Sequence, residues 1–287
     1  SDLIGNSPIA PQTGLNSFRG NVANMETKGI DVNITGNWVK QEFNWTTNFI
    51  YSYVKDKITK YEVEQTTNYS YMQRNYVNPY EGYPYSALFS FPFLGLDGEG
   101  NPLGLVDGQP SADYGALINM TGIENMVYHG SQVPTHFGSI RNTFGYKNFI
   151  FSFNITFKAG YYYRRSSLNN GNLYQDVPIA GIADYASRWQ VSGDESWTNV
   201  PSLIYPSNSS RDAFYQYSDI LVENASHIRL QDIQLSYLFG NSRIMPFKDL
   251  QFNCYLNNVA ILYRSNNHNW DPDVHQGGGY PVPRTIS

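Results

Sequence analysis

Four possible metal ligands lie between residues 268 and 275: His268, Asp271, Asp273 and His275. Carboxylate oxygens two residues apart, beside two imidazoles, have the chemistry that a divalent cation requires. The same stretch contains Asp271-Pro272, and Asp-Pro commonly begins a turn. We therefore interpret this segment as a structural loop, and we predict no metal site and no cofactor.

Carboxylates elsewhere do not make a convincing catalytic pair. Asp194 and Glu195 are adjacent, so on a strand their side chains would point to opposite faces. The spacing of the glycines in the stretch 95–104 fits neither the P-loop nor the dinucleotide-binding fingerprint. The stretch is typical of turns. The sequence contains no HExxH, Walker or GxSxG motif. Its single cysteine, Cys254, excludes a disulfide framework and a thiolate zinc site. These features indicate that the protein is not an enzyme.

Aromatic side chains are the best candidates for contact with a ligand. They gather in long irregular stretches, where we expect them to be exposed, Phe89 and Phe91 included. Loops on a rigid scaffold often carry binding residues. The alternative is that these rings pack loop against loop, or against a lid subunit. We predict ligand contact for six of them: Tyr83, Tyr85, Trp189, Trp197, Tyr205 and Trp270.

The composition restricts the class of protein that must position these residues. Of 287 residues, 41% are hydrophobic, 16% aromatic and only 15% charged, which excludes wholesale disorder. The net charge of −5 argues against a nucleic-acid partner. No apolar run is long enough for a spanning helix, and the N-terminus lacks a signal peptide, so we expect a mature product or a fragment. The composition suits a secreted β-protein or an outer-membrane barrel.

The hydrophobic pattern has a period of two, which is typical of strands with one apolar and one polar face. In 149–163, phenylalanines at alternate positions share one face, and Ser152, Asn154 and Thr156 share the other. The segment 227–231 is out of phase with 233–239, which predicts either a β-bulge or an exit of the chain from the apolar layer. The same alternation predicts strands over 28–38, 43–54, 141–146, 149–163, 233–239 and 249–256.

Strand length and connection length favour a membrane barrel over a sandwich. The alternating runs reach the ~9–11 residues that cross a bilayer at a tilt. Short links at 39–42, 147–148 and 240–248 alternate with long ones at about 55–136, 164–226 and 263–282. Short periplasmic turns and long extracellular loops characterise bacterial outer-membrane barrels. Aromatic girdles are expected at both interfaces, formed by Trp38, Tyr146, Phe149 and Phe239 near the turns and by Tyr51, Tyr53, Tyr161 and Tyr163 at the other end.

Six full strands and the start of a seventh, at 283–287, are expected. Membrane barrels begin at about eight strands, and an open edge cannot persist in hydrocarbon. The chain is therefore predicted to be all-β, a segment of about seven strands of a large antiparallel transmembrane barrel. Other strands must complete that barrel. The alternative is a secreted β-sandwich or carbohydrate-binding domain.

Five pieces of the chain occur in one order that resembles the C-terminal barrel portion of SusC/RagA-type TonB-dependent outer-membrane transporters. Their signposts are a KGID strand entry, a YKNFIFS hairpin, a GDESWTNVP loop, SHIRLQDIQLSY and a DP loop. The pieces themselves are 21–58, 138–164, 187–201, 225–239 and 250–274.

The resemblance implies a barrel of about 22 strands in the bacterial outer membrane, to which residues 1–287 contribute roughly the last seven. It implies an importer of glycans or peptides that is powered through TonB and works with a SusD-like surface lipoprotein. No plug, no TonB box and no aromatic-ended last strand is recognised in the chain. The implied partners are therefore the other barrel strands, TonB through another part of the receptor, membrane lipid, and an oligosaccharide or peptide substrate.

Overall fold

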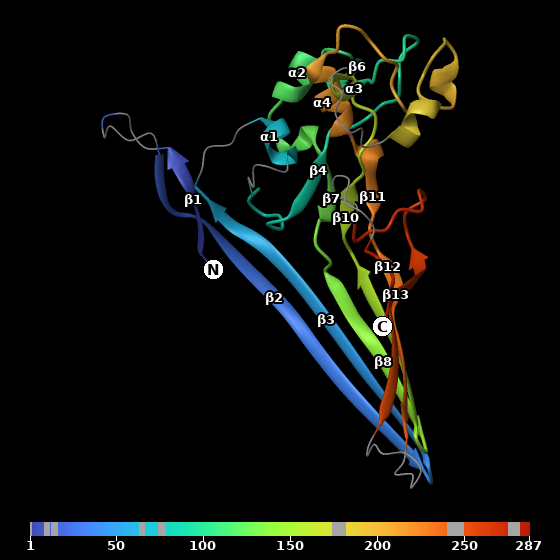
Figure 1. The fold of residues 1–287 in the computed structure, drawn as a ribbon. Coiled ribbons are helices and arrows are strands. Elements are labelled where there is room, and N and C mark those ends of the chain that lie inside the picture. The colour runs from blue at the N-terminus through green and yellow to red at the C-terminus, as the bar shows by residue number, and fades with distance from the viewer. Residues whose placement is uncertain are drawn as a thin grey trace.

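The computed structural model describes residues 2–8, 12, 17–62, 67–73, 79–173, 182–239, 250–274 and 282–287. Its main element is an eight-stranded antiparallel sheet in the order β1-β2-β3-β8-β9-β12-β13-β14. Figure 1 shows the long strands converging on their turns at one end, with a compact head at the other. The strands are β1 (Asp2–Pro8), β2 (Ser17–Lys40), β3 (Phe43–Tyr61), β8 (His136–Tyr146), β9 (Phe149–Ala159), β12 (His227–Leu238), β13 (Gln251–Arg264) and β14 (Thr285–Ile286).

The all-β prediction is confirmed, and so are the six long strands. Two-residue turns join β2 to β3 and β8 to β9, and Gln41 and Lys147 adopt positive φ angles there. The link 240–248 lies outside the described residues. Strand β1 was not predicted, because DLIGNSP has no clear alternation. Strand β2 begins at Ser17, before the predicted strand 28–38, and the prediction missed this part because its residues are mostly polar. At 24 residues, β2 is longer than a bilayer crossing needs.

The register places the predicted apolar side chains on one face of the sheet. Phe151 lies opposite Phe144 on one neighbouring strand and opposite Leu235 on the other. Many of these side chains are exposed, among them Ile34 and Phe252, and within the described residues no second sheet covers them. This exposed apolar face agrees with the predicted barrel segment and not with the alternative β-sandwich, whose apolar face would be packed in protein.

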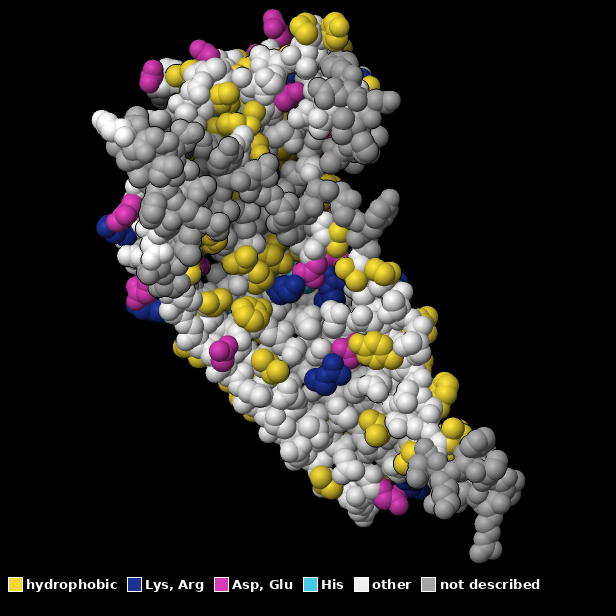
Figure 2. Space-filling model, turned by 60° about the vertical axis from the view of Figure 1, so that its left-hand side comes forward, with side chains coloured by type: hydrophobic (Ala, Val, Ile, Leu, Met, Phe, Trp, Pro, Cys, Tyr) yellow, Lys and Arg dark blue, Asp and Glu magenta, His cyan; other side chains and the backbone are white. Residues whose placement is uncertain are grey.

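The opposite face of the sheet is polar. Asn48 donates to Asn33 and Thr35, and Ser52 donates to Asp31. Figure 2 shows this face as mainly uncharged, with basic and acidic side chains side by side at two places. A polar face with paired charges suits the watery interior of a barrel, and the apolar face suits lipid.

The predicted bulge lies within β12, where the register shifts between Leu230 and Asp232 against both neighbouring strands. The extra residue reverses the alternation. Upstream of it, Ile228 pairs with Phe157, and Leu230 pairs with Ile155, on the apolar face. The bulge therefore keeps the apolar side chains of β12 on one face of the sheet, although the alternation in the sequence changes phase.

The two long connections after β3 and β9 fold together into the head. The first holds α1 (Asn68–Met72), β4 (Ala87–Ser90), β5 (Gly104–Val106), β6 (Gln109–Ser111), α2 (Tyr114–Asn119), η2 (Ile123–Asn125) and β7 (Val127–Ser131). The second holds β10 (Tyr162–Arg164), α3 (Asn170–Leu173), η3 (Ile182–Ser187), η4 (Asp194–Ser196), α4 (Ser209–Gln216), η5 (Asp219–Leu221) and β11 (Val222–Asn224).

A hydrophobic core joins the two connections of the head. The rings of Phe91, from the first connection, and Phe214, from the second, lie 5.5 Å apart. Phe89 and Phe91 are buried, so the expectation that they are exposed is wrong: local sequence marks them as loop residues, but tertiary packing covers them. The core consists of Met72, Phe89, Phe91, Tyr114, Leu117, Met126 and Phe214.

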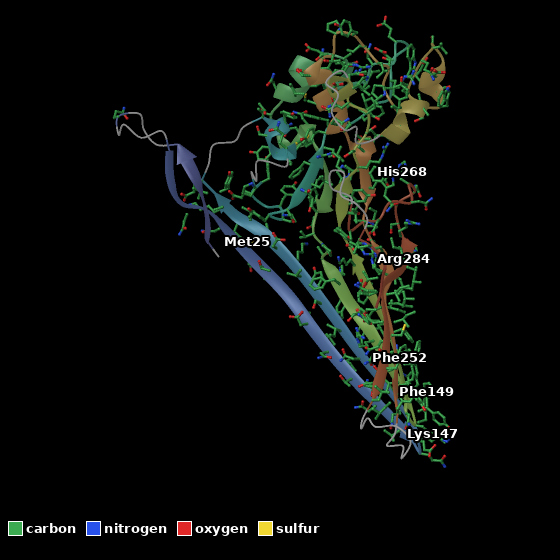
Figure 3. All side chains as sticks on the ribbon, in the orientation of Figure 1. Met25, Lys147, Phe149, Phe252, His268 and Arg284 are labelled. Carbon is green, nitrogen blue, oxygen red and sulfur yellow. The ribbon has the colours of Figure 1, made fainter. Side chains whose placement is uncertain are left out.

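The strand predicted over 149–163 ends at Ala159, because Gly160 adopts a φ of +73° and breaks the extended run. Tyr161 and Tyr163 are consequently buried with Ala225 at the base of the head, so they are not part of a girdle. Figure 3 places Lys147 at the tip of the turn end, with Phe149 and Phe252 above it. The described residues include no helix that is long and apolar enough to span a membrane.

Candidate functional site

The two candidate tyrosines of the first connection have different environments in the structure. The ring of Tyr83 packs within 5.3 Å of Phe89 and 4.8 Å of Tyr128, so it helps to hold the head together. Tyr85 is exposed, and its backbone N–H donates to Asp56 Oδ2 at 2.6 Å. Of the two, Tyr85 is therefore better placed to meet a ligand.

The two candidate tryptophans of the second connection lie in one tight loop with Asp194 and Glu195. The indole of Trp189 donates to Glu195 at 2.8 Å, and that of Trp197 donates to Asp194 at 3.1 Å. Backbone hydrogen bonds from Val191 and from Gln190 lower the pKa of Asp194, and the hydrogen bond from Trp189 lowers that of Glu195. Both carboxylates therefore stabilise the loop as charged acceptors.

Of these two indoles, Trp197 is exposed and Trp189 is half-buried. Trp189 lies against Gly100, where an added Cβ would come within 2.5 Å of the ring. Trp197 is 60% exposed. The loop therefore uses Trp189 for packing and presents Trp197.

Tyr205 is 85% exposed, at the surface of the head. The buried Arg211 guanidinium fixes the backbone near it by donating to the carbonyls of Ser202 and Gly100, each at 3.0 Å. Because Trp189 packs on Gly100, Arg211 connects the segment that carries Tyr205 to the tryptophan loop. The head thus holds three exposed candidates on a rigid frame: Tyr85, Trp197 and Tyr205.

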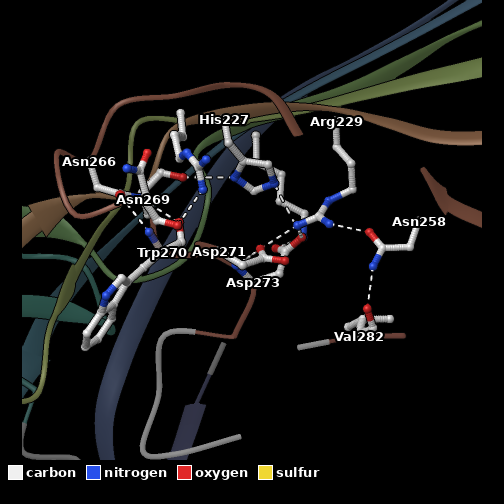
Figure 4. A network of polar contacts seen from close by, with 12 residues as sticks. His227, Arg229, Asn258, Asn266, Asn269, Trp270, Asp271, Asp273 and Val282 are labelled. Carbon is white, nitrogen blue, oxygen red and sulfur yellow. Dashed lines mark hydrogen bonds and ion pairs between the residues drawn. The ribbon is translucent and has the colours of Figure 1, made fainter. Parts of the chain in front are cut away.

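The sixth candidate, Trp270, lies in a different place. It belongs to residues 265–274, the segment that follows β13, which we call the inner loop. Its backbone N–H donates to Asn266 Oδ1 at 3.2 Å, and Figure 4 shows its ring directed away from Arg229 and Asp273. Among the described residues, no ring contact joins Trp270 to the aromatics of the head, so the six candidates do not form one site.

Two of the possible metal ligands are held by cations of the chain itself. Asp271 accepts from Arg229 at 2.5 Å, and Asp273 accepts from Lys158 at 2.7 Å and from Arg229 at 3.2 Å. His227 Nε2 lies 3.4 Å from Asp273 (Figure 4). Partial burial would raise the pKa of Asp273, but hydrogen bonds and the charges of His227 and Lys158 hold it well below its usual range.

Of the remaining two possible ligands, the structure describes only His268. His268 Nε2 lies 3.0 Å from Glu223, and Figure 3 places His268 near the head end of the sheet. His275 is outside the described residues. Within the described part of the chain, no group of three or more His, Cys, Asp or Glu side chains is arranged to hold a metal ion.

The sequence analysis missed the charged residues inside the strands. Arg141 donates to both carboxylate oxygens of the buried Asp232, at 3.0 and 2.9 Å, across strand β9. Arg229, also buried, is on the same polar face. The sequence did contain a signal, because these ionisable residues lie within strands that are otherwise rich in apolar residues. A charged side chain at membrane depth is costly unless it faces the interior of the barrel.

Comparison with known proteins identifies the architecture. No family model matches the chain. The TonB-dependent receptor P39 of Formosa agariphila is 24% identical over 329 residues, covering 98% of this chain and 30% of that protein. The TonB-dependent receptor P26 of the same organism is 25% identical over 314 residues, covering 100% of this chain and 31% of that protein.

The fold agrees with the sequence comparison. A solved structure of the RagAB peptide transporter superposes with a TM-score of 0.67 at 20% identity, covering 95% of this chain and 29% of that chain. The RagAB peptide importer in its closed-closed state gives 0.65 at 21% identity, covering 92% and 29%. The chain is therefore similar to TonB-dependent receptors along nearly its whole length, and its fold is that of a segment of the RagAB structures. Its location is therefore the bacterial outer membrane, and it spans less than a third of the length of the relatives that it matches.

Proposed function

We propose that this chain forms part of the wall and outer vestibule of an outer-membrane importer that is powered through TonB. The main support is the similarity to TonB-dependent receptors along nearly the whole chain. We assign residues 1–287 to the barrel and assign the plug and the TonB box to another part of the receptor. The chain itself has no catalytic role in this proposal.

The substrate in this proposal is an oligosaccharide or a peptide, captured together with a SusD-like surface lipoprotein. Support for a peptide comes from the RagAB structures, which are described as those of a peptide transporter. Support for a binding role of the head comes from its exposed rings, Tyr85, Trp197 and Tyr205, on a rigid frame. The other three candidates, Tyr83, Trp189 and Trp270, contribute through packing or through the inner loop.

Uptake and binding by the intact receptor test this function. Labelled peptides and oligosaccharides should accumulate only in cells with active TonB. Trp197→Ala and Tyr205→Ala should each raise the Kd by roughly fivefold, which is about 1 kcal/mol. Tyr146→Ala, an exposed ring at the opposite end of the sheet, is the matched control and should leave the Kd unchanged. Uptake that continues without TonB would refute the proposal.

A further inference from the structure

The inner loop takes an indirect course between the strands that it connects. It leaves β13 at Arg264, and the chain rejoins the sheet in β14, which pairs with the outer side of β13. The side chains of Asp271 and Asp273 nevertheless contact residues of β12 and β9, on the other side of β13. The described part of the loop therefore extends from β13 over β12 toward β9, away from β14.

The crossing takes place on the polar face of the sheet. Arg229 pairs with Thr156 on β9, and the flanking Ile228 and Leu230 belong to the apolar face. His227 pairs with Lys158, so these two side chains and Arg229 share the polar face. An outward course would put the same charges toward lipid, where charged side chains are costly. The inner loop therefore lies inside the barrel.

The loop also reaches below the end of the strand. Arg229 pairs with Ile261, while β13 continues to Arg264. At ~3.3 Å per residue, the contact is about 10 Å down the wall. Farther down, Asn258 accepts from Arg229 at 2.5 Å and donates to the carbonyl of Val282 at 2.5 Å (Figure 4).

The contacts that Arg229 makes with the loop are largely shielded from water. The side chain of Arg229 is 5% exposed, and those of Asp271 and Asp273 are 16% and 27% exposed. Removing one partner from such a group leaves a buried charge without compensation. The loop is therefore fastened to the wall.

We infer that the inner loop is a fixed constriction at the outer mouth of the lumen, and that the cluster of Lys158, His227, Arg229, Asp271 and Asp273 positions it there. The inference rests on the proposed transport function. A loop folded into a barrel reduces the cross-section through which a solute passes. Asp271 and Asp273 thus act as positioning residues for the size limit on the transported substrate.

Spin-label distances in the intact receptor test the positioning directly. In a Cys254→Ala background, nitroxides are attached at Asn267 in the loop and Lys57 on β3, both exposed. The distance distribution should be narrow and should broaden in Asp273→Asn. The matched control is Glu62→Gln, which breaks the exposed Lys60–Glu62 pair and should leave the distribution unchanged. An unchanged distribution in Asp273→Asn would overturn the inference.

Size-graded uptake tests the constriction. Asp273→Asn should increase the uptake of long fluorescent peptides and dextrins, relative to short ones, several-fold. If the loop becomes mobile in Asp273→Asn but the ratio of long to short substrate uptake does not change, the inference is also overturned. If Asp273→Asn fails to assemble, Lys158→Gln carries both tests, because it leaves Arg229 and His227 beside Asp273. A wild-type receptor without TonB-dependent uptake would refute the proposed function, while the distances would still report the position of the loop.

Discussion

Individual residues of the strands are sorted by the two environments on either side of the wall. Arg141 and Asp232 lie on the polar face and neutralise one another across β9. On the other face, Trp45 donates to Asn142 Oδ1 at 3.0 Å, so even a polar side chain there has a partner. The low dielectric of the bilayer makes such pairing necessary, since an unsatisfied polar group in hydrocarbon costs several kcal/mol.

Neighbouring residues of β2 test this sorting. Ile34 is exposed on the apolar face and Asn33 on the polar face. Ile34→Arg should cost about 2–4 kcal/mol, as for a cation near the bilayer midplane, whereas Asn33→Arg meets water and should cost much less. Equilibrium unfolding of the receptor in lipid vesicles measures both. Equal costs would mean that the apolar face does not contact lipid.

At the scale of elements, the bulge in β12 decides which side chains face lipid. Deletion of Gln231 would remove the extra residue and turn His227 and Arg229 toward the membrane. We expect little assembled receptor in the outer membrane, as measured by the heat-modifiable band on a gel. Gln231→Ala keeps the bulge, loses only the hydrogen bond to Asn257, and should assemble normally. Normal assembly of the deletion variant would contradict the assigned faces.

The head is a second element with its own core, so it can be weakened without opening the sheet. Phe214 is completely buried, and Phe214→Ala should destabilise the head by about 3–5 kcal/mol. Protease added to intact cells should then cut the head faster, while the membrane-embedded strands stay protected. Tyr205→Ala changes an exposed ring and should leave the cleavage rate unchanged. Simultaneous loss of the strands would show that head and sheet unfold together.

At the scale of the whole molecule, the head and the short turns lie at opposite ends of the sheet, which predicts their sidedness (Figure 1). A cysteine at Gly98, where an added Cβ meets no atom within 4 Å, should react with a bulky thiol reagent on intact cells. A cysteine at Asn148, in the turn between β8 and β9, should not react. The background carries Cys254→Ala. Labelling at 148 alone would invert the topology.

The sequence by itself determined the strands, their faces and their short turns. Successive side chains of a strand must point to opposite sides, so alternation in 149–159 is a local property that needs no knowledge of the fold. The phase change before Ile233 likewise indicated a bulge or an exit from the apolar layer, and the register of the sheet shows that it is a bulge. The same local pattern continues past Ala159, however, and only the left-handed Gly160 ended the strand there.

Tertiary structure alone decided the head and the charged cluster of the inner loop. Phe91 and Phe214 meet through packing between two connections, and their burial has no local signature. Lys158 and Asp273 are 115 positions apart in the chain, so their pairing depends on the order of strands in the sheet. Asp271 and Asp273 resembled metal ligands in the sequence. In the fold they hold the inner loop, because their carboxylates pair with Arg229 and Lys158 of the same chain.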